Sequence, residues 1–326
     1  MSEPRYDVVG VGNALVDVLA PCEEAFIAHE HAAHGMERGA MSLISEQRAV
    51  ELYAKMTNTT EMSGGSAANT IAHLAALSGR GAFIGKVADD PLGAVFIDDL
   101  RQMGIAYDTT PLILGPRTGR CLILVTPDAT RTMNTFLGAA TELRVDDIDP
   151  EIVSSAQITF LEGYLFDRPN AKQAFFAAGV IASQAGHRVA LTLSDLFCVE
   201  RHRDDFKDLI DQHIDILFAN ETEVKSLAQT DDLDAALSFL KGKCEVVVVT
   251  LGAKGSVIFS GDDTYHIAPI TPERLVDTTG AGDAYAAGFL RGFTQGLPLN
   301  ECGALAAKTA TSVLTHMGPR PPKRAV

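Results

Sequence analysis

Short apolar runs alternate with helix-length segments along most of the chain. These runs cover residues 6–11, 82–87, 158–161, 188–193, 214–218 and 245–251. Runs of this length between polar segments are typical of buried strands. Strands that alternate with helices predict a mostly parallel sheet covered by helices. We therefore expect an α/β fold.

Two parts of the chain depart from this alternation. Residues 119–125 and 131–136 are apolar runs joined by a short polar linker, which predicts a β-hairpin. Residues 21–41 are polar, contain histidines and show no clean period, so we expect irregular structure there. Helical spacing returns in residues 45–56, where Ser45 is placed to cap a helix.

Further helices are predicted over residues 66–77, 281–295 and 299–316. No internal repeat, low-complexity tract or Ser/Gly linker divides the chain. We therefore predict a single domain over residues 1–326. A small β lid is expected from residues 15–44 and 106–136.

The composition is that of an ordinary globular protein with an acidic surface. Hydrophobic residues make up 46% of the chain, charged residues make up 21%, and the formal net charge is −15. This charge argues against nucleic acid and anionic lipid as partners, since both are bound through clustered Lys and Arg. Five cysteines without a CxxC pair favour a reducing compartment. With no basic N-terminal region and no long apolar run, these features predict a cytoplasmic protein without a membrane span.

The most informative motif is VDTTGAGDAYAAGF, residues 276–289. Small residues at 280–282 let a ligand approach the backbone, and the helix that follows directs free N–H groups to the same place. We therefore expect an anion to bind there. Asp283 lies in the first turn of this helix, as an ordinary first-turn acid or as a functional carboxylate. The motif alone leaves both interpretations open.

A second glycine motif, MSGGSAANT in residues 62–70, also leads into a helix. Its small residues suit either close packing of the helix or close approach of a ligand. With both motifs present, the sequence resembles the PfkB carbohydrate kinase family, also called the ribokinase-like family, whose signatures are a GG segment and a DTxGAGD segment. The resemblance extends over the whole chain through residues 12–17, 85–93, 220–223 and 250–255.

The resemblance implies a ribokinase-like three-layer sandwich with a mostly parallel central sheet and a small β lid. It also implies an enzyme that transfers a phosphoryl group from ATP, with Mg²⁺, to an alcohol group. Asp283 corresponds to the residue that accepts the proton of the attacking hydroxyl, which is a weak nucleophile without such help. Gly280, Ala281 and Gly282 correspond to an anion hole for the transferring phosphoryl group.

The same resemblance assigns the nucleotide-binding positions. Asn220 and Glu223 match a motif that organises Mg²⁺ largely through water, and they also fit a capping box at a helix N-terminus. Thr250 and Gly252 match contacts to ATP phosphate. The turn to Gly255 is expected to border the adenine pocket, with a plain β-turn as the alternative.

The acceptor is expected to bind at the opening motif and at the first signature. Asp17 matches a carboxylate that accepts hydrogen bonds from paired sugar hydroxyls. Asn13, Gly64, Gly65 and Asn69 match further acceptor contacts.

A cation site is a further implication of the resemblance. Asp277 and Thr279 match positions that contact a monovalent cation, potassium for example, and Thr279 is also expected beside the nucleotide. Gly318 is expected to close this site.

Two groups of residues are interpreted as structural. The three histidines between residues 29 and 34 lack the Cys or carboxylate pattern of a metal site, so we expect an exposed loop. Arg117, Arg120 and Arg131 lie near the predicted hairpin, within possible reach of substrate, and we interpret them as solvated strand-edge residues.

Rival functions fit the residues less well. Residues 9–12 begin a dinucleotide-binding pattern, but Leu15 stands where its third glycine is needed. A P-loop needs Ser or Thr directly after a Gly-Lys pair. Residues 85–86 are a Gly-Lys pair, but Val87 follows them. A relative that binds ligand without turnover is expected to lack the base, whereas Asp283 is present.

The acceptor is predicted from resemblance within the family. The spacing from Asn13 to Asp17 and residues 131–140 look more like the adenosine kinase branch than like ribokinase. We therefore predict a nucleoside, adenosine, phosphorylated at the ribose 5′-hydroxyl. A sugar kinase similar to ribokinase, fructokinase or 2-keto-3-deoxygluconate kinase is the alternative. The partner is a small molecule, and both a monomer and a homodimer stay open, because an exposed lid edge can pair.

Overall fold

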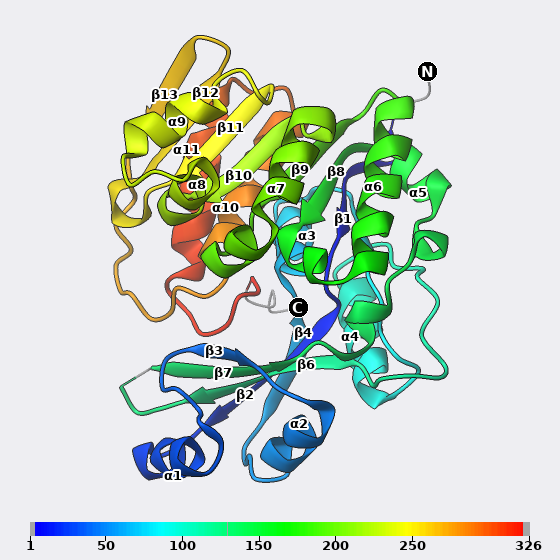
Figure 1. The fold of residues 1–326 in the computed structure, drawn as a ribbon, viewed down its shortest axis with the longest axis vertical. Coiled ribbons are helices and arrows are strands. Elements are labelled where there is room, and N and C mark those ends of the chain that lie inside the picture. Colours follow the sequence, from blue (N-terminus) through cyan, green and yellow to red (C-terminus); the bar gives the residue numbers. More distant parts are fainter. Residues whose placement is uncertain (1–3, 129, 322–326) are drawn as a thin grey trace.

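The computed structural model describes residues 4–128 and 130–321, which form a large sheet between two layers of helices, and a smaller sheet (Figure 1). The large sheet contains β1 (Tyr6–Val11), β5 (Gly81–Ile84), β8 (Ala156–Glu162), β9 (Arg188–Thr192), β10 (Ile216–Asn220), β11 (Val246–Thr250), β12 (Ser256–Ser260) and β13 (Asp263–Ile267). Its strand order is β13-β12-β11-β10-β9-β8-β1-β5. Neighbours from β11 to β5 are parallel, whereas β12 and β13 are added antiparallel at one edge.

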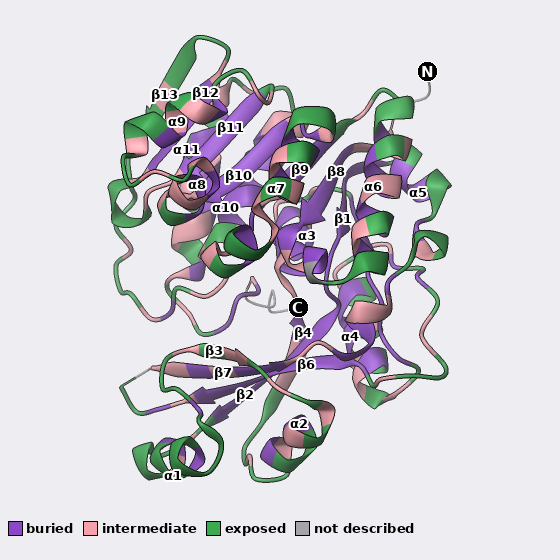
Figure 2. Cartoon of the chain, viewed as in Figure 1, coloured by how far each residue is buried: buried purple, intermediate pink, exposed green. Residues whose placement is uncertain are grey.

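Helices cover both faces of this sheet, and Figure 2 shows that its strands are largely buried, except for the edge strand β13. Adjacent residues of β1 belong to different hydrophobic clusters, Val8 to one and Val9 to the other, and both are fully buried. The layer on the side of Val8 consists of α3 (Ser66–Ala76), α4 (Pro91–Gln102), α10 (Ala281–Thr294) and α11 (Leu299–Val313). The other consists of α5 (Pro150–Ser154), α6 (Pro169–Gln184), α7 (Leu196–His213), α8 (Glu221–Ala228) and α9 (Leu233–Leu240). These layers confirm the predicted α/β fold.

The second sheet, here called the lid, contains β2 (Leu15–Pro21), β3 (Met41–Leu43), β4 (Thr60–Gly64), β6 (Gly119–Val125) and β7 (Arg131–Phe136). Its order is β3-β7-β6-β2-β4. Two helices, α1 (Glu24–His34) and α2 (Glu46–Tyr53), lie on the side of the lid away from the large sheet (Figure 1). β6 and β7 have the bounds of the predicted hairpin, and Ser45 caps α2 by accepting a hydrogen bond from the Arg48 N–H at 3.2 Å. β4 comes from outside the two predicted lid segments.

The expectation of irregular structure over residues 21–41 is wrong for most of that segment, because α1 occupies it. Only Ile27 and Glu30 of this helix are buried. A helix with so small a buried side carries no continuous apolar stripe, so its sequence shows no helical period. The three histidines of this segment therefore lie on a helix and not in a loop. None of the helices in the described part of the chain is long and apolar enough to cross a bilayer.

The register of the lid sorts its side chains into two faces. Directly paired residues point to the same face, so Asp17, Cys121 and Thr135 share one face. Leu122 and Asn134, one position along each strand, share the opposite face. Leu122 packs there in the same cluster as buried residues of α1 and α2. The face of Asp17 is therefore directed toward the large sheet.

Candidate active site

Asp283 lies at the start of α10 and is held by side chains of a second helix. Its Oδ1 accepts a hydrogen bond from Ser66 Oγ at 2.6 Å, and its Oδ2 accepts one from Asn69 Nδ2 at 2.9 Å. Both donors belong to the first turn of α3, so the two glycine motifs meet at this carboxylate. Burial raises the pKa of Asp283, and the two hydrogen bonds oppose that rise. The result is an oriented carboxylate that is more basic than a solvated aspartate.

Asp17 approaches the same helix from the lid. It is 7% exposed, and burial raises its pKa to about 6. A side chain at Gly64 would put its Cβ 2.5 Å from the carboxyl carbon of Asp17, so glycine is needed there to leave room for the carboxylate. Gly65 follows as the N-cap of α3. Asp17, Gly64, Gly65 and Asn69, all predicted to contact the acceptor, therefore lie together.

The late glycine motif forms the N-terminus of α10. Gly280 is the N-cap, with φ of 77°, in the left-handed region that favours glycine. The Ala281 N–H, one of the predicted anion-hole donors, donates to Thr278 O at 3.3 Å. The N–H groups of Gly282 and Asp283 are the next two of this first turn, and such groups have no partner within their own helix. An anion placed at this helix end is stabilised by these donors and by the helix dipole.

Arg131 of the lid reaches the loop ahead of α10. It pairs with Asp277 at 2.5 Å and donates to Thr279 Oγ1 at 2.7 Å, and its side chain is 8% exposed. The interpretation of Arg131 as a solvated strand-edge residue is therefore wrong. Asp277 also accepts hydrogen bonds from the N–H groups of Thr279 and Gly318. A monovalent cation at Asp277 has to share this carboxylate with Arg131.

Glu162 is a residue of this site that the sequence motifs did not single out. It ends β8, is 1% exposed, and accepts hydrogen bonds from Asn13 Nδ2 at 2.7 Å and from the Ala67 N–H at 2.8 Å. Burial raises its pKa to about 7. The sequence did contain a signal for Glu162, since it is an acidic residue at the end of a predicted strand. Ligands bind at the carboxyl edge of parallel sheets, so such a residue is a candidate for the site.

Arg320 is a second residue of this site that the sequence motifs did not single out. Its Nε donates to Ser63 O at 2.8 Å and its Nη1 donates to Ala68 O at 2.7 Å. The side chain is therefore buried against the backbone of the first glycine motif. Burial raises the pKa of Asp17 and Asp283, and the positive charge of Arg320 opposes this rise in both. Arg320 belongs to no recognised motif, so only the tertiary contact identifies it.

The predicted nucleotide-binding residues lie further along the carboxyl edge of the large sheet. Asn220 ends β10 and Thr250 ends β11, and the two are paired in register. Asn220 and Glu223 form a capping box at the start of α8, with Asn220 Nδ2 donating to Glu223 Oε1 at 2.6 Å. Gly252 and Gly255 stand at the two ends of the turn between β11 and β12. The capping interpretation of the Asn220–Glu223 pair is thus correct.

The chemistry of this pair suits indirect binding of Mg²⁺. Glu223 is 4% exposed, and both of its carboxylate oxygens accept hydrogen bonds from Asn220. Burial raises the pKa of Glu223 to about 7. Among the described residues, no group of three or more His, Cys, Asp or Glu side chains is placed to hold a metal ion. Mg²⁺ here is expected to be held mainly through water and phosphate oxygens, which suits its tight hydration.

Known proteins resemble this chain, some over nearly its whole length and others over part of it. The model of the pfkB family of carbohydrate kinases matches residues 39–325. The structure of an adenosine kinase from Sinorhizobium meliloti is 45% identical, with a TM-score of 0.90, and the match covers 98% of this chain and 96% of that one. A probable sugar kinase from Rhizobium etli is 44% identical, with a TM-score of 0.91 and the same two coverages. A cytidine kinase from Thermococcus kodakarensis is 35% identical over 137 residues, 41% of this chain and 49% of that one.

The buried carboxyl groups predict a pH-dependent stability. Glu162 has a pKa near 7 in the folded chain, whereas an unfolded glutamate titrates near 4.3. The folded state therefore holds the extra proton, and the free energy of unfolding falls as the pH rises through this window. We expect Glu162→Gln to reduce this fall by on the order of 2 to 3 kcal/mol, at about 1.4 kcal/mol per pKa unit.

Urea unfolding at pH 5 and pH 8 measures this difference. Glu273→Gln removes an exposed carboxylate and is the matched control, which should leave the pH dependence of the original chain unchanged. An equal fall in stability for Glu162→Gln and the original chain would show that Glu162 is ionised at both pH values.

Proposed function

The chain belongs to the pfkB family of carbohydrate kinases, and we propose that it phosphorylates the ribose 5′-hydroxyl of adenosine. As a member of this family it is a phosphotransferase that acts on an alcohol group with ATP as co-substrate. The observation that carries the proposed chemistry is the Asp283 carboxylate, held by Ser66 and Asn69 at the N-terminus of α10.

We assign the role of general base to Asp283. As the 5′-oxygen bonds to the γ-phosphorus of ATP, its proton passes to the Asp283 carboxylate. The bond from that phosphorus to the β–γ bridging oxygen breaks, and ADP leaves. Ser66 and Asn69 already fix the carboxylate, so little reorganisation is needed when the hydroxyl arrives.

The charge of the transferring group is balanced by donors from both parts of the molecule. We assign the binding of the phosphoryl oxygens to the N–H groups of Gly282 and Asp283, because such donors stabilise negative charge most strongly in a site shielded from water. Arg131, held by Asp277, adds a cation from the lid at the same loop. Mg²⁺, organised through water near Glu223, supplies further neutralisation of phosphate charge when it is bound.

The lid supports a nucleoside as the acceptor. The face that carries Asp17 is otherwise largely apolar, and its members include Leu19, Met62, Cys121, Ile123 and Met133. Met41 and Leu43 of β3 are in register with Met133 and Thr135, and they are 43% and 58% exposed. Such a surface suits a planar base, whereas the hydroxyls of a free sugar would lack partners against it. Asp17 beside this surface is suited to accept hydrogen bonds from the ribose hydroxyls.

The similar proteins bear on the acceptor in different ways. The structure from S. meliloti is that of an adenosine kinase, and the T. kodakarensis relative is a cytidine kinase, which supports a nucleoside acceptor. The R. etli structure is described as a probable sugar kinase. A sugar kinase similar to ribokinase, fructokinase or 2-keto-3-deoxygluconate kinase is therefore the second candidate.

A substrate screen separates these candidates. Adenosine, cytidine, ribose, fructose and 2-keto-3-deoxygluconate are each offered with ATP and Mg²⁺, and ADP release is measured. We expect the highest kcat/KM with adenosine, and AMP as its product by mass spectrometry. Turnover confined to a free sugar would replace our proposal with the second candidate.

Removal of the proposed base should abolish most of the turnover. We expect Asp283→Asn to lower kcat by roughly 10² to 10⁴, the usual contribution of general base catalysis. The affinity for ATP, measured by isothermal titration calorimetry, should stay nearly unchanged. Asp262→Asn, at a fully exposed carboxylate between β12 and β13, is the control and should keep full activity. A kcat for Asp283→Asn close to that of the original chain would contradict the assigned role.

A polar substitution on the apolar lid surface should lower the activity with a nucleoside and leave the activity with a free sugar unchanged. We expect Leu43→Asn to lower kcat/KM for adenosine about tenfold, in proportion to the lost apolar contact. Any residual turnover of ribose should not change. Val50→Asn replaces a similarly exposed apolar residue of α2 on the other side of the lid and is the matched control. Equal kinetics of both variants with adenosine would argue that the base does not contact β3.

A further inference from the structure

Arg120 is a buried cation at the junction of the lid and α4. It lies on β6, is 7% exposed, and its guanidinium carbon is 5.7 Å from the centre of the Tyr53 ring. The interpretation of Arg120 as a solvated strand-edge residue is therefore wrong. Desolvation lowers its pKa, which reflects the cost of keeping its charge away from water.

No carboxylate of the described part of the chain lies within ion-pair distance of this charge, and Glu46 and Asp90 act on it only from further away. Arg120 forms no ion pair with a carboxylate there, and its Nε and Nη2 have no hydrogen-bond partner. These two nitrogens direct their N–H groups from the same edge of the planar guanidinium. Paired donors of this kind match the two oxygens of a carboxylate or a phosphate. A buried charge left unpaired is costly, so a ligand that pairs with it is favoured.

Arg120 lines a hollow of about 290 Å³. Part of its wall is apolar and comes from α4, through Pro91, Leu92 and Val95. The two carboxylates in the wall already have partners. Glu61 accepts a hydrogen bond from Tyr53 Oη at 2.5 Å, and Asp90 caps α4 by accepting the Gly93 N–H at 2.8 Å. Arg117 also lines the hollow, but its side chain is 66% exposed and pairs with Glu46 at 3.8 Å. The buried donors without a partner in this hollow therefore belong to Arg120.

We propose that this hollow binds a small oxyanion, the carboxylate or phosphate group of a metabolite, through Nε and Nη2 of Arg120. Its volume admits a small molecule, and the guanidinium lies over the Tyr53 ring. The walls come from the lid and from α4 of the main layer, so a bound anion connects the two parts.

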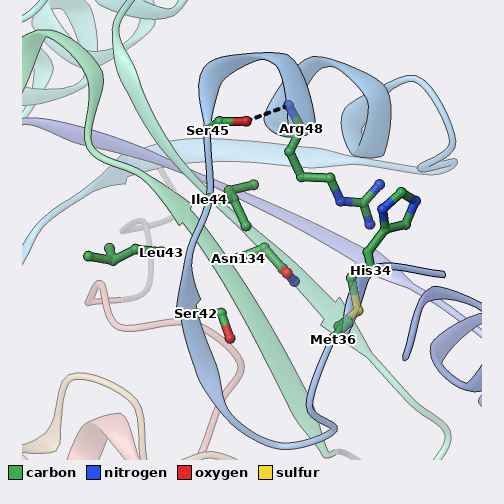
Figure 3. Close-up of a pocket in the computed structure, with 9 residues that line it drawn as sticks. His34, Met36, Ser42, Leu43, Ile44, Ser45, Arg48 and Asn134 are labelled. Carbon is green, nitrogen blue, oxygen red and sulfur yellow. Dashed lines mark hydrogen bonds between the residues drawn. The ribbon is translucent and has the colours of Figure 1, made fainter. Parts of the chain in front are cut away.

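A second hollow on the same face of the lid also contains buried donors without a hydrogen-bond partner, Arg48 Nη1 and Asn134 Nδ2, but its arginine has a counter-ion (Figure 3). It has a volume of about 310 Å³, and Arg48, His34 and Asn134 lie around it. Arg48 there bonds to Glu30, whose side chain is fully buried, so the guanidinium charge is neutralised. An unpaired buried cation therefore distinguishes the hollow at Arg120 from this one.

Titration calorimetry with inorganic phosphate and with malonate tests the proposal at constant ionic strength. An excess of a non-hydrolysable ATP analogue with Mg²⁺ fills the nucleotide site, so that phosphate cannot report on the N-terminus of α10. We expect saturable binding of at least one of the two probes to the original chain, and the preferred probe separates a phosphate site from a carboxylate site. Arg120→Met should weaken this binding about tenfold or more, as expected for loss of charged hydrogen bonds.

Two further variants keep the test decisive. Arg144→Met removes an arginine whose side chain is 61% exposed, and it should bind the probes as the original chain does. Arg120→Lys keeps the charge without the paired donors and should bind more weakly than the original chain, even if Arg120→Met does not fold. The absence of saturable binding to the original chain, or equal binding by the Arg120 variants, would overturn the proposal whatever the enzyme phosphorylates.

Discussion

The hydrogen bonds from Ser66 and Asn69 to Asp283 are the contact on which the rest of the site depends. They join side chains 217 and 214 positions apart in the chain. Each helix begins at a glycine N-cap beside the carboxyl edge of the large sheet. The parallel order of the sheet therefore brings a general-base candidate, its orienting groups and a set of free N–H donors to one place.

This arrangement buries several carboxyl groups close together, which is unfavourable. Arginine side chains from outside the two glycine motifs offset this cost. Burial raises the pKa of Asp17, Glu162 and Asp283, because a carboxylate loses solvation there. Arg320 arrives from the C-terminal end and Arg131 from the lid. Since Arg131 pairs with Asp277, lid position and the electrostatics of the α10 loop are coupled. The contact between the lid and the large sheet thus depends on the charge balance of the site.

Local patterns predicted most of the fold and the centre of the site. The hairpin of β6 and β7, the cap at Ser45 and the start of α10 follow from turn residues and spacing that act over a few positions. The helix α1 was missed because its buried side is too small to leave a period in the sequence. Arg120 and Arg131 were misinterpreted because nothing in a strand pattern tells whether an arginine meets solvent or an acid from a distant segment.

By itself, the sequence determined the α/β class and the two glycine motifs, since glycine conformation, helix capping and strand burial are local properties. The role expected of Asp283 came from the resemblance to a family. Tertiary structure decided which side of the lid faces the large sheet, that Glu162 and Arg320 join the site, and that Arg120 is left without an ion pair. These depend on strand register and on contacts between segments far apart in the chain. Whether a charged side chain is buried or paired depends on the residues that lie near it in space. The order of residues along the chain does not show which residues these are.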